Sequence, residues 1–322
     1  MQLVLDSRAS SILYLFLMEN KGSGKWMIPT NVCHFIPACF IKSNCPFEII
    51  DVNLDTLRIC EEEVISRLVK DGRNYSGILT VRNFGEEYPQ ISFFNKIKKS
   101  APHLKIIDDA CLSYPNFNST ILHQVDLELY STGYSKPVDI DYGGFAKMHD
   151  NQKKIIPKEL NFDENRLIQM NNVYRNSLKN SIGIQETIFK TDWLLSKKIN
   201  KKEYIDKVNL NIAKSRVHRE IINNTYDKYL NPSFKETRLS TNWRYNIRLS
   251  NPLKVLEKIF EEGLFASQHY YPLNLAFKKG ICPNWENIYK SMLNLFNDHR
   301  FSDLQAKKCC QIINSYAKAL NS

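Results

Sequence analysis

Three residues that could act together in a chemical reaction lie between Ile106 and Gly144. Asp109 ends the apolar run I-I-D-D, and Ser131 ends the run L-Y-S about twenty residues later. Lys136 follows in a polar loop. If both runs are strands of an α/β sheet, their last residues lie at the carboxyl ends of strands, where such sheets bind ligands. The sequence therefore places a carboxylate, a hydroxyl and an amine at one edge of a sheet.

This combination suits pyridoxal phosphate (PLP). An amine can form a Schiff base with the cofactor, a carboxylate can pair with its pyridinium nitrogen, and a hydroxyl can hold its phosphate. On this interpretation Lys136 is the catalytic residue, and Asp109 and Ser131 bind the cofactor. A single charged residue in a loop is usually only solvated, so the joint spacing of the three residues carries the prediction.

The same stretch resembles the signature of the DegT/DnrJ/EryC1/StrS family of PLP-dependent sugar aminotransferases. In that family an E-D-A-A-Q-like motif precedes a Ser-x4-Lys-x6-Gly-Gly motif. This chain has D-D-A-C-L at residues 108–112, and then Ser131, Lys136 and Gly143-Gly144 at the same spacing. The resemblance implies the type I fold of PLP-dependent transferases, with a mainly parallel mixed sheet flanked by helices and a smaller α+β C-terminal domain.

The resemblance extends to further positions in the site. The place of the family's phosphate-binding Gly-[Thr/Arg]-x-Ala segment is taken by Ser7, Arg8, Ala9 and Ser10. An ordinary capped helix explains those four residues equally well. Cys33 stands at the position that stacks on the cofactor ring, although His34 could stack instead, and Leu112 stands where the family has Gln or His. In the C-terminal third, the H-Y-Y-P-L segment implies that His269 and Tyr271 contact the substrate.

The resemblance implies transfer of an amino group, with glutamate as the expected donor, to a keto group of a nucleotide-linked sugar. Such a reaction would serve surface polysaccharide or secondary metabolite synthesis. One alternative is a PLP-dependent sugar dehydratase, but that branch replaces the lysine with histidine, so Lys136 argues against it. Another is a catalytically inactive PLP-fold regulator or partner subunit, which Leu112 favours somewhat.

The family completes each active site with residues of the neighbouring subunit, so a homodimer with shared sites is expected. Its N-Y-R-M-like partner motif is not found here, and Asn171–Arg175 is the nearest composition. The alternative is a monomer whose site is closed by its own residues 150–200.

Composition limits the other possibilities. At 322 residues with 43% hydrophobic residues, the chain is long enough for two domains. We expect a large PLP-binding domain at 1–200, followed by a bridging helix and a small domain at 201–322. The net charge of +10 invites a nucleic-acid partner, but the lysines are scattered among acids and form no compact stripe. An anionic substrate is equally compatible with the excess, and no nucleic acid is expected.

The eight cysteines contain no C-x-x-C pair and do not match a zinc ribbon or finger. We expect reduced, mostly buried thiols and no metal. The apolar run Ile12–Met18 is too short to span a bilayer. We therefore expect no membrane span and a cytoplasmic protein.

Strands alternate with helices in the pattern that a mainly parallel sheet requires. A buried helix capped by Ser or Asp is expected near the start of the chain, before Met18, and a long bridging helix at Lys201–Leu230. Between them the patterns predict strands at Phe47–Val52, Gly77–Phe84, Leu104–Asp108, Leu127–Tyr130 and Gly144–Met148, and helices at Asp55–Val69 and Pro89–Lys99.

Overall fold

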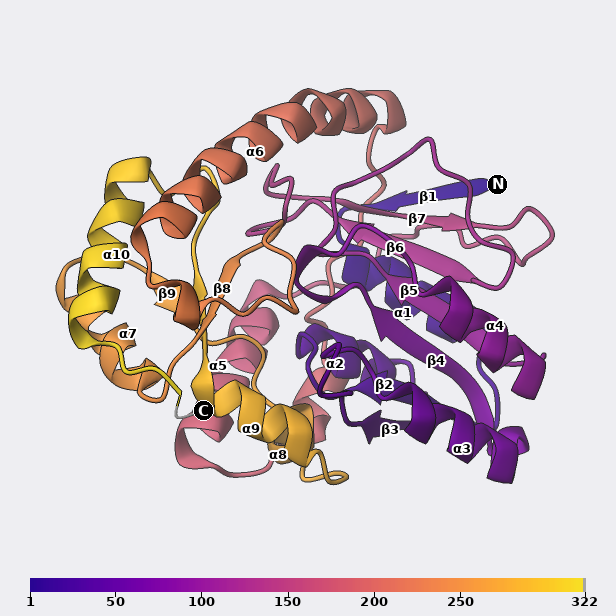
Figure 1. Cartoon of the computed structure of the whole chain (residues 1–322). Coiled ribbons are helices and arrows are strands. Elements are labelled where there is room, and N and C mark those ends of the chain that lie inside the picture. Colours follow the sequence, from indigo (N-terminus) through magenta and orange to yellow (C-terminus); the bar gives the residue numbers. More distant parts are fainter. Residues whose placement is uncertain (321–322) are drawn as a thin grey trace.

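The computed structural model of the chain describes residues 1–320 and contains two separate sheets (Figure 1). The larger sheet has the strand order β1-β7-β6-β5-β4-β2-β3. β7 runs antiparallel to both of its neighbours, β1 and β6, whereas β6, β5, β4, β2 and β3 pair in parallel. The strands are β1 (Gln2–Asp6), β2 (Lys25–Pro29), β3 (Phe47–Ile50), β4 (Tyr75–Val81), β5 (Lys105–Asp109), β6 (Leu127–Ser131) and β7 (Gly144–Met148).

Helices cover both faces of this sheet, and neighbouring residues of one strand face opposite sides. In β4, Leu79 packs with α1 (Ala9–Glu19) and α2 (Phe35–Lys42), and Ile78 packs with α3 (Glu61–Asp71) and α4 (Ile91–Ser100). Ile107 and Ile106 of β5 divide between the same two faces. This burial on both sides explains why the central strands are continuous apolar runs.

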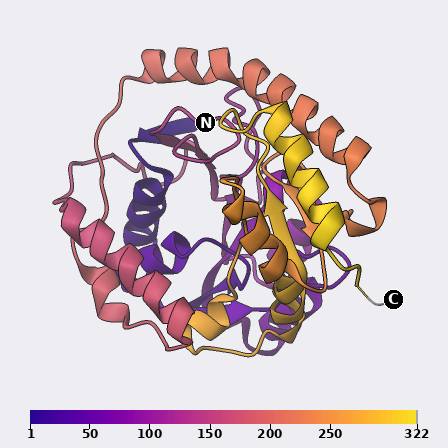
Figure 2. The same ribbon diagram turned by 90° about the vertical axis from the view of Figure 1, so that its left-hand side faces the viewer.

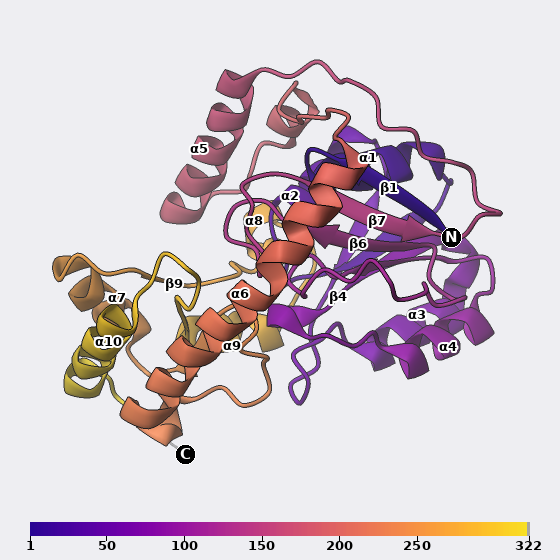
Figure 3. The same cartoon turned by 90° about the horizontal axis from the view of Figure 1, so that it is seen from above.

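The smaller sheet, of order β8-β10-β9, is antiparallel and lies in the C-terminal part of the chain. Figure 2 shows α6 passing over the molecule to reach α10, and Figure 3 shows the same helix running from the β1 side of the large sheet to the small one. The elements of this part are α6 (Lys201–Tyr229), β8 (Tyr245–Arg248), α7 (Pro252–Glu261), β9 (Ala266–Ser267), α8 (Leu273–Phe277), α9 (Pro283–Ser291), β10 (Met292–Leu295) and α10 (Asp303–Tyr316).

The segment between the two sheets contains α5 (Glu164–Asn180) and the short 3-10 helix η3 (Glu186–Lys190). Further 3-10 turns occur at η1 (Gly72–Asn74), η2 (Asn83–Gly85) and η4 (Pro232–Phe234). Leu273 and Phe277 of α8 pack into the apolar cluster of α1 and α2. The division at residue 200 stays a prediction.

The type I fold expected from the motifs is confirmed: a mainly parallel mixed sheet between helices, followed by a small α+β part. The predicted β7 has the expected bounds, and α6 ends one residue before the expected end. The eight cysteines are all free, and Cys33 and Cys60 are the two that are not fully buried. Among residues 1–320, no helix is both long and apolar enough to cross a membrane.

Two predicted helix starts are wrong. The helix expected from Asp55 begins only at Glu61, because the Asn53 side chain accepts hydrogen bonds from the backbone N–H groups of Asp55 (2.9 Å) and Thr56 (3.1 Å) and holds a turn there. The first helix is not capped by Ser or Asp: its N-cap is Arg8, whose side chain makes no capping hydrogen bond. Strands β1 and β2 and helix α2 were not among the predicted elements.

Candidate active site

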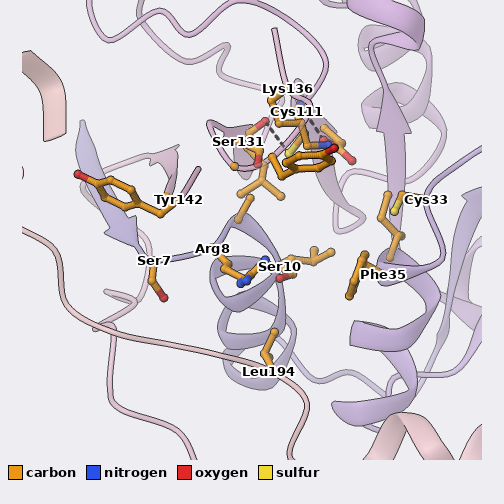
Figure 4. Close-up of a pocket in the computed structure, with 18 of the residues that line it drawn as sticks. Ser7, Arg8, Ser10, Cys33, Phe35, Cys111, Ser131, Lys136, Tyr142 and Leu194 are labelled. Atoms are coloured by element: carbon orange, nitrogen blue, oxygen red, sulfur yellow. Dashed lines mark hydrogen bonds between the residues drawn. The ribbon is translucent and has the colours of Figure 1, made fainter. Parts of the chain in front are cut away.

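A cavity of about 360 Å³ lies where β5 and β6 end, beside the N-terminus of α1. In Figure 4, Lys136, Cys111 and Ser131 lie together, with Arg8 and Ser10 on the first turn of α1 opposite them. The cavity is lined by Ser7, Arg8, Ala9, Ser10, Leu13, Cys33, Phe35, Ile36, Asp109, Cys111, Leu129, Ser131, Gly133, Tyr134, Lys136, Asp141, Tyr142, Gly143, Leu167, Trp193 and Leu194.

Asp109 is the last residue of β5 and is a buried carboxylate without a cationic partner. Its side chain is 6% exposed, and its Oδ1 accepts a hydrogen bond from the backbone N–H of Cys111 (2.9 Å). It forms no ion pair with any residue between 1 and 320. Burial raises the pKa of this carboxyl, and the hydrogen bonds from Cys111 and the nearby charge of Lys136 oppose the rise. The site therefore offers a buried acceptor for a cation.

Ser131 and Lys136 provide the other two groups. Ser131 ends β6, is 7% exposed, and its hydroxyl makes no hydrogen bond within the described residues. The backbone N–H of Lys136 donates to the carbonyl of Gly133 (3.3 Å), which closes a turn after β6. The half-buried Lys136 ammonium has neither a hydrogen-bond nor an ion-pair partner in residues 1–320. The structure thus brings all three groups to one cavity with their polar atoms available.

The first turn of α1 forms the opposite wall. Arg8 is exposed there, and no carboxylate of the described chain lies within ion-pair distance of it. The hydroxyl of Ser7 has a different role, because it donates to Asp6 Oδ1 (3.1 Å) and accepts from the backbone N–H of Lys197 (3.1 Å). Ala9 and Ser10 lie on the wall, whereas Ser7 fastens the turn to a distant segment.

The Gly-Gly pair allows β7 to approach this turn closely. A Cβ on Gly144 would lie 2.5 Å from the backbone nitrogen of Ala9, which no side-chain movement could relieve. Gly143 has φ +91°, and a Cβ there would lie 2.4 Å from the Tyr204 ring. The motif therefore keeps α1 against the sheet end that carries Ser131.

The chain's own segment between the sheets closes the cavity. Leu167, Trp193 and Leu194 line it. The strap, which we define as residues 193–197, is fastened to the β1–α1 turn: Ser11 Oγ donates to Leu195 O (2.5 Å), and Ser196 Oγ donates to Asp6 Oδ2 (2.6 Å). Residues of the 150–200 segment therefore line the cavity, and the monomeric alternative, in which this segment closes the site, stays a prediction. Sharing of sites between subunits stays a prediction.

Cys33, which the resemblance places against the cofactor ring, lines the cavity, and its stacking role stays a prediction. Burial raises the pKa of its thiol, but the hydrogen bond and charge of His34 and the charge of Lys136 more than offset this and lower it. His34 itself stacks on Tyr174 with ring centroids 4.1 Å apart and is not among the lining residues.

Three other expected residues lie outside the lining. Leu112 packs in an apolar cluster with Trp243, and the neighbouring Cys111 reaches the cavity instead. The His269 ring lies 5.1 Å from the Trp243 ring, and burial and nearby positive charges lower its pKa to about 3, so it is neutral. Tyr271 packs edge-on against Tyr289.

Several lining aromatic residues were not predicted. Tyr134 and Tyr142 flank Lys136 in the sequence, so their place in the same loop was a usable signal. Phe35 and Trp193 had no such signal, because they come from elements that only packing brings together.

No family model matches the chain, and a search of curated proteins finds no match either. Solved structures do match. A DegT DnrJ EryC1 StrS aminotransferase from Brucella abortus has a TM-score of 0.69 at 17% identity, over 98% of this chain and 86% of that chain. A sugar aminotransferase from Micromonospora echinospora has a TM-score of 0.67 at 14% identity, over 98% and 87%.

A third match is the E. coli GDP-4-keto-6-deoxy-D-mannose-3-dehydratase with bound hydrated PLP, with a TM-score of 0.65 at 15% identity, over 97% of this chain and 87% of that chain. At these identities the likeness concerns the fold. The chain therefore has the fold of PLP-dependent aminotransferases that the solved DegT/DnrJ/EryC1/StrS structures display, as its motifs predict.

Proposed function

We propose that the protein is a PLP-dependent aminotransferase that transfers an amino group, with glutamate as donor, to a keto group of a nucleotide-linked sugar. The observation that carries the proposal is the meeting of Asp109, Ser131 and Lys136 at one cavity. Among residues 1–320, the Asp109 carboxylate has no ion-pair partner, and the Ser131 hydroxyl and the Lys136 amine have no hydrogen-bond partner. The solved sugar aminotransferases with this fold support it.

The residues present fit the cofactor. PLP carries a ring nitrogen that is cationic when protonated, an aldehyde and an anionic phosphate. The buried Asp109 carboxylate suits the first, and the Lys136 amine suits the second. The Ser131 hydroxyl, the Arg8 guanidinium and the N-terminus of α1 suit the phosphate. When bound, PLP would supply an electron sink for the carbon that bears the amino group.

Each residue then has a defined task. Asp109 would keep a proton on the ring nitrogen, and its raised pKa would make its carboxylate a stronger hydrogen-bond acceptor there. Lys136 Nζ would hold the aldehyde of the cofactor, and as a free amine it would accept a proton from the substrate carbon and deliver it to the carbon of the former aldehyde. Trp193 and Leu194 exclude water from one side of the cavity.

The finer parts of the proposal rest on the resemblance and on charge. The net charge of +10 and Arg8, which has no ion-pair partner among residues 1–320, favour an anionic substrate such as a nucleotide-linked sugar. His269 and Tyr271 remain candidates for substrate contact, although they lie outside the cavity lining. We propose a cytoplasmic homodimer that acts in surface polysaccharide or secondary metabolite synthesis. Lys136 disfavours the sugar dehydratase, whose branch carries histidine there.

Covalent capture of the cofactor tests the proposal. Purified protein mixed with PLP should develop an absorbance band at roughly 400–430 nm that borohydride removes. Peptide mapping after reduction should then find the pyridoxyl group on Lys136. Glutamate should bleach the band, and a nucleotide-linked keto sugar should restore it. A label on another lysine, or no label, would contradict the assignment of the site.

A further inference from the structure

The loop that carries Lys136 belongs to the large sheet, but side chains from beyond residue 200 hold it. Trp243 Nε1 donates to the carbonyl of Ser135 (2.7 Å), and Arg219 Nη2 donates to the carbonyl of Lys136 (3.2 Å). Further along the loop, Arg300 Nη2 pairs with Asp139 Oδ2 (2.9 Å). The position of Lys136 therefore depends on the C-terminal part of the chain.

Arg219 of α6 has an unusual environment for a cation. It is 2% exposed, and no carboxylate among residues 1–320 lies within ion-pair distance of it. Its Nη1 donates to the carbonyl of Trp243 (2.7 Å) and to the Asn297 side chain, and its Nη2 donates to the carbonyls of Lys136 and Pro137 (3.4 Å). Burial lowers its pKa. Burying a guanidinium without a carboxylate partner costs free energy. Hydrogen bonds to neutral acceptors, three backbone carbonyls and the Asn297 side chain, offset part of this cost.

The neighbouring contacts differ from the contact between Arg219 and the Lys136 carbonyl. Arg244, also fully buried, pairs with Asp298 (3.1 Å). The Pro137 carbonyl accepts a second hydrogen bond, from Ser215. The Lys136 carbonyl accepts from Arg219 alone within the described residues. Removal of Arg219 would thus release the peptide unit of Lys136 and leave the two flanks of its loop fastened.

We propose that Arg219 is the positioning residue for Lys136: its guanidinium fixes the Lys136 peptide, and so the direction in which the amine enters the cavity, and ties that direction to α6. The proposal rests on the proposed function. The planar fork of an arginine serves two directions at once, with one nitrogen toward Trp243 and the other toward Lys136. A lysine retains the charge but has a single nitrogen, so it cannot reproduce both contacts.

The test compares Arg219→Lys and Arg219→Ala with Arg216→Gln, a control on the same helix whose 48% exposed side chain pairs with Glu87. Each protein is mixed with PLP, and the rate of appearance of the borohydride-reducible band is measured. Both Arg219 variants should slow it by roughly tenfold to a hundredfold, and added guanidinium ions should restore part of the rate in Arg219→Ala. The control should match the wild type.

Amide hydrogen exchange of the 133–139 peptide in cofactor-free protein gives a readout that does not depend on activity. Exchange should be faster in both Arg219 variants and unchanged in Arg216→Gln. Folded variants with wild-type exchange and capture rates would overturn the proposal. So would failure of both variants to fold, since Arg219 would then belong to the core. If the wild-type chain itself captures no PLP, the proposed function fails, and the exchange comparison still tests the Arg219 contact.

Discussion

Two neighbouring aspartates at the end of β5 have opposite environments. The side chain of Asp108 accepts two hydrogen bonds from Arg82, at 2.6 and 3.0 Å, within a buried group that also contains Glu128 and Lys147. Asp109 faces the cavity and has no cation of the described chain to pair with. Alternation along a strand turns the two side chains to opposite faces, so only Asp109 is available to a ligand.

Lys136→Ala is expected to abolish capture of PLP and turnover while the protein remains folded. The Lys136 amine makes no hydrogen bond or ion pair within residues 1–320, so its loss should change the free energy of unfolding by no more than about 0.5 kcal/mol. Absorbance after PLP addition and thermal unfolding check the two parts. Lys153→Ala, at an exposed lysine outside the cavity, is the control. A reducible band in Lys136→Ala would remove this lysine from its role.

Asp109→Asn is expected to bind PLP but to lose turnover by roughly a hundredfold or more, because an amide cannot hold the ring nitrogen protonated. Turnover with saturating PLP measures the effect. A rate equal to that of the wild type would remove Asp109 from the site.

The same substitution has a predicted pH signature in cofactor-free protein. Burial raises the pKa of Asp109 above its ordinary value of 3.8, so folding disfavours the carboxylate. The buried carboxylate therefore lowers the free energy of unfolding. This effect is absent at a pH below the pKa of Asp109 in the unfolded chain, and it develops as the pH rises through the pKa of Asp109 in the folded protein. Asp109→Asn should therefore unfold at a higher temperature than the wild type at pH 7, and the difference should vanish near pH 3. A difference that is the same at both pH values would show that the carboxylate is not its cause.

At the scale of elements, the site depends on the contact between β7 and the first turn of α1. Gly144 pairs with Asp6 and Ser131 across the two neighbouring strands, and its Cα faces the backbone of Ala9. The strap holds the other side of the same turn through Asp6 and Ser11. The amides that begin α1 are thus fixed between a strand and a segment 190 residues away in the sequence.

Gly144→Ala is expected to weaken PLP binding by roughly tenfold or more, because the new Cβ would lie 2.5 Å from the Ala9 nitrogen and would displace the α1 turn. Titration with PLP and thermal unfolding measure the two effects. Gly72→Ala is the matched control, since its Cβ would meet only the Ala101 Cβ at 3.8 Å. Equal PLP affinity in Gly144→Ala and the wild type would show that the position of this turn does not determine binding.

At the scale of the whole molecule, the C-terminal part acts on the site through contacts with the Lys136 loop rather than by lining the cavity. All the lining residues belong to residues 7–194. The loop is contacted instead by side chains that do not line the cavity, namely Trp243, Arg219 and Arg300. Movement of this part relative to the large sheet would therefore move Lys136.

Dilution of the proposed homodimer distinguishes the two predicted arrangements: a cavity walled only by residues of the same chain, such as Leu167, Trp193 and Leu194, should keep its cofactor when the subunits separate. Sedimentation at falling concentration, recorded at the wavelength of the PLP band, measures association and cofactor together. Loss of the band at the concentration where the dimer dissociates would show instead that each site needs residues of the partner.

The sequence by itself determined the class of the fold and identified three polar residues that line one cavity. Asp109, Ser131 and Lys136 were identifiable because PLP demands these residue types, and because apolar runs that end in polar residues indicate strand ends in an α/β sheet. The order of strands and helices from β3 to β7 was also accessible, since it depends on periodicity within short windows, whereas β1, β2 and α2 were not predicted. The bounds of β7 were predicted correctly for this reason.

The tertiary structure alone decided what surrounds those three residues. The strap carries no motif, and its place over the α1 turn depends on hydrogen bonds to Asp6 and Ser11 from positions far along the chain. In the sequence, Arg219 cannot be distinguished from any other arginine of a polar helix. Only the packing of α6 shows that its side chain is buried and donates to the Lys136 carbonyl. Leu112 occupies a motif position, yet it turns into the core because its apolar side chain packs with Trp243. Local patterns determine how a segment folds, whereas contacts between distant segments depend on which surfaces pack together.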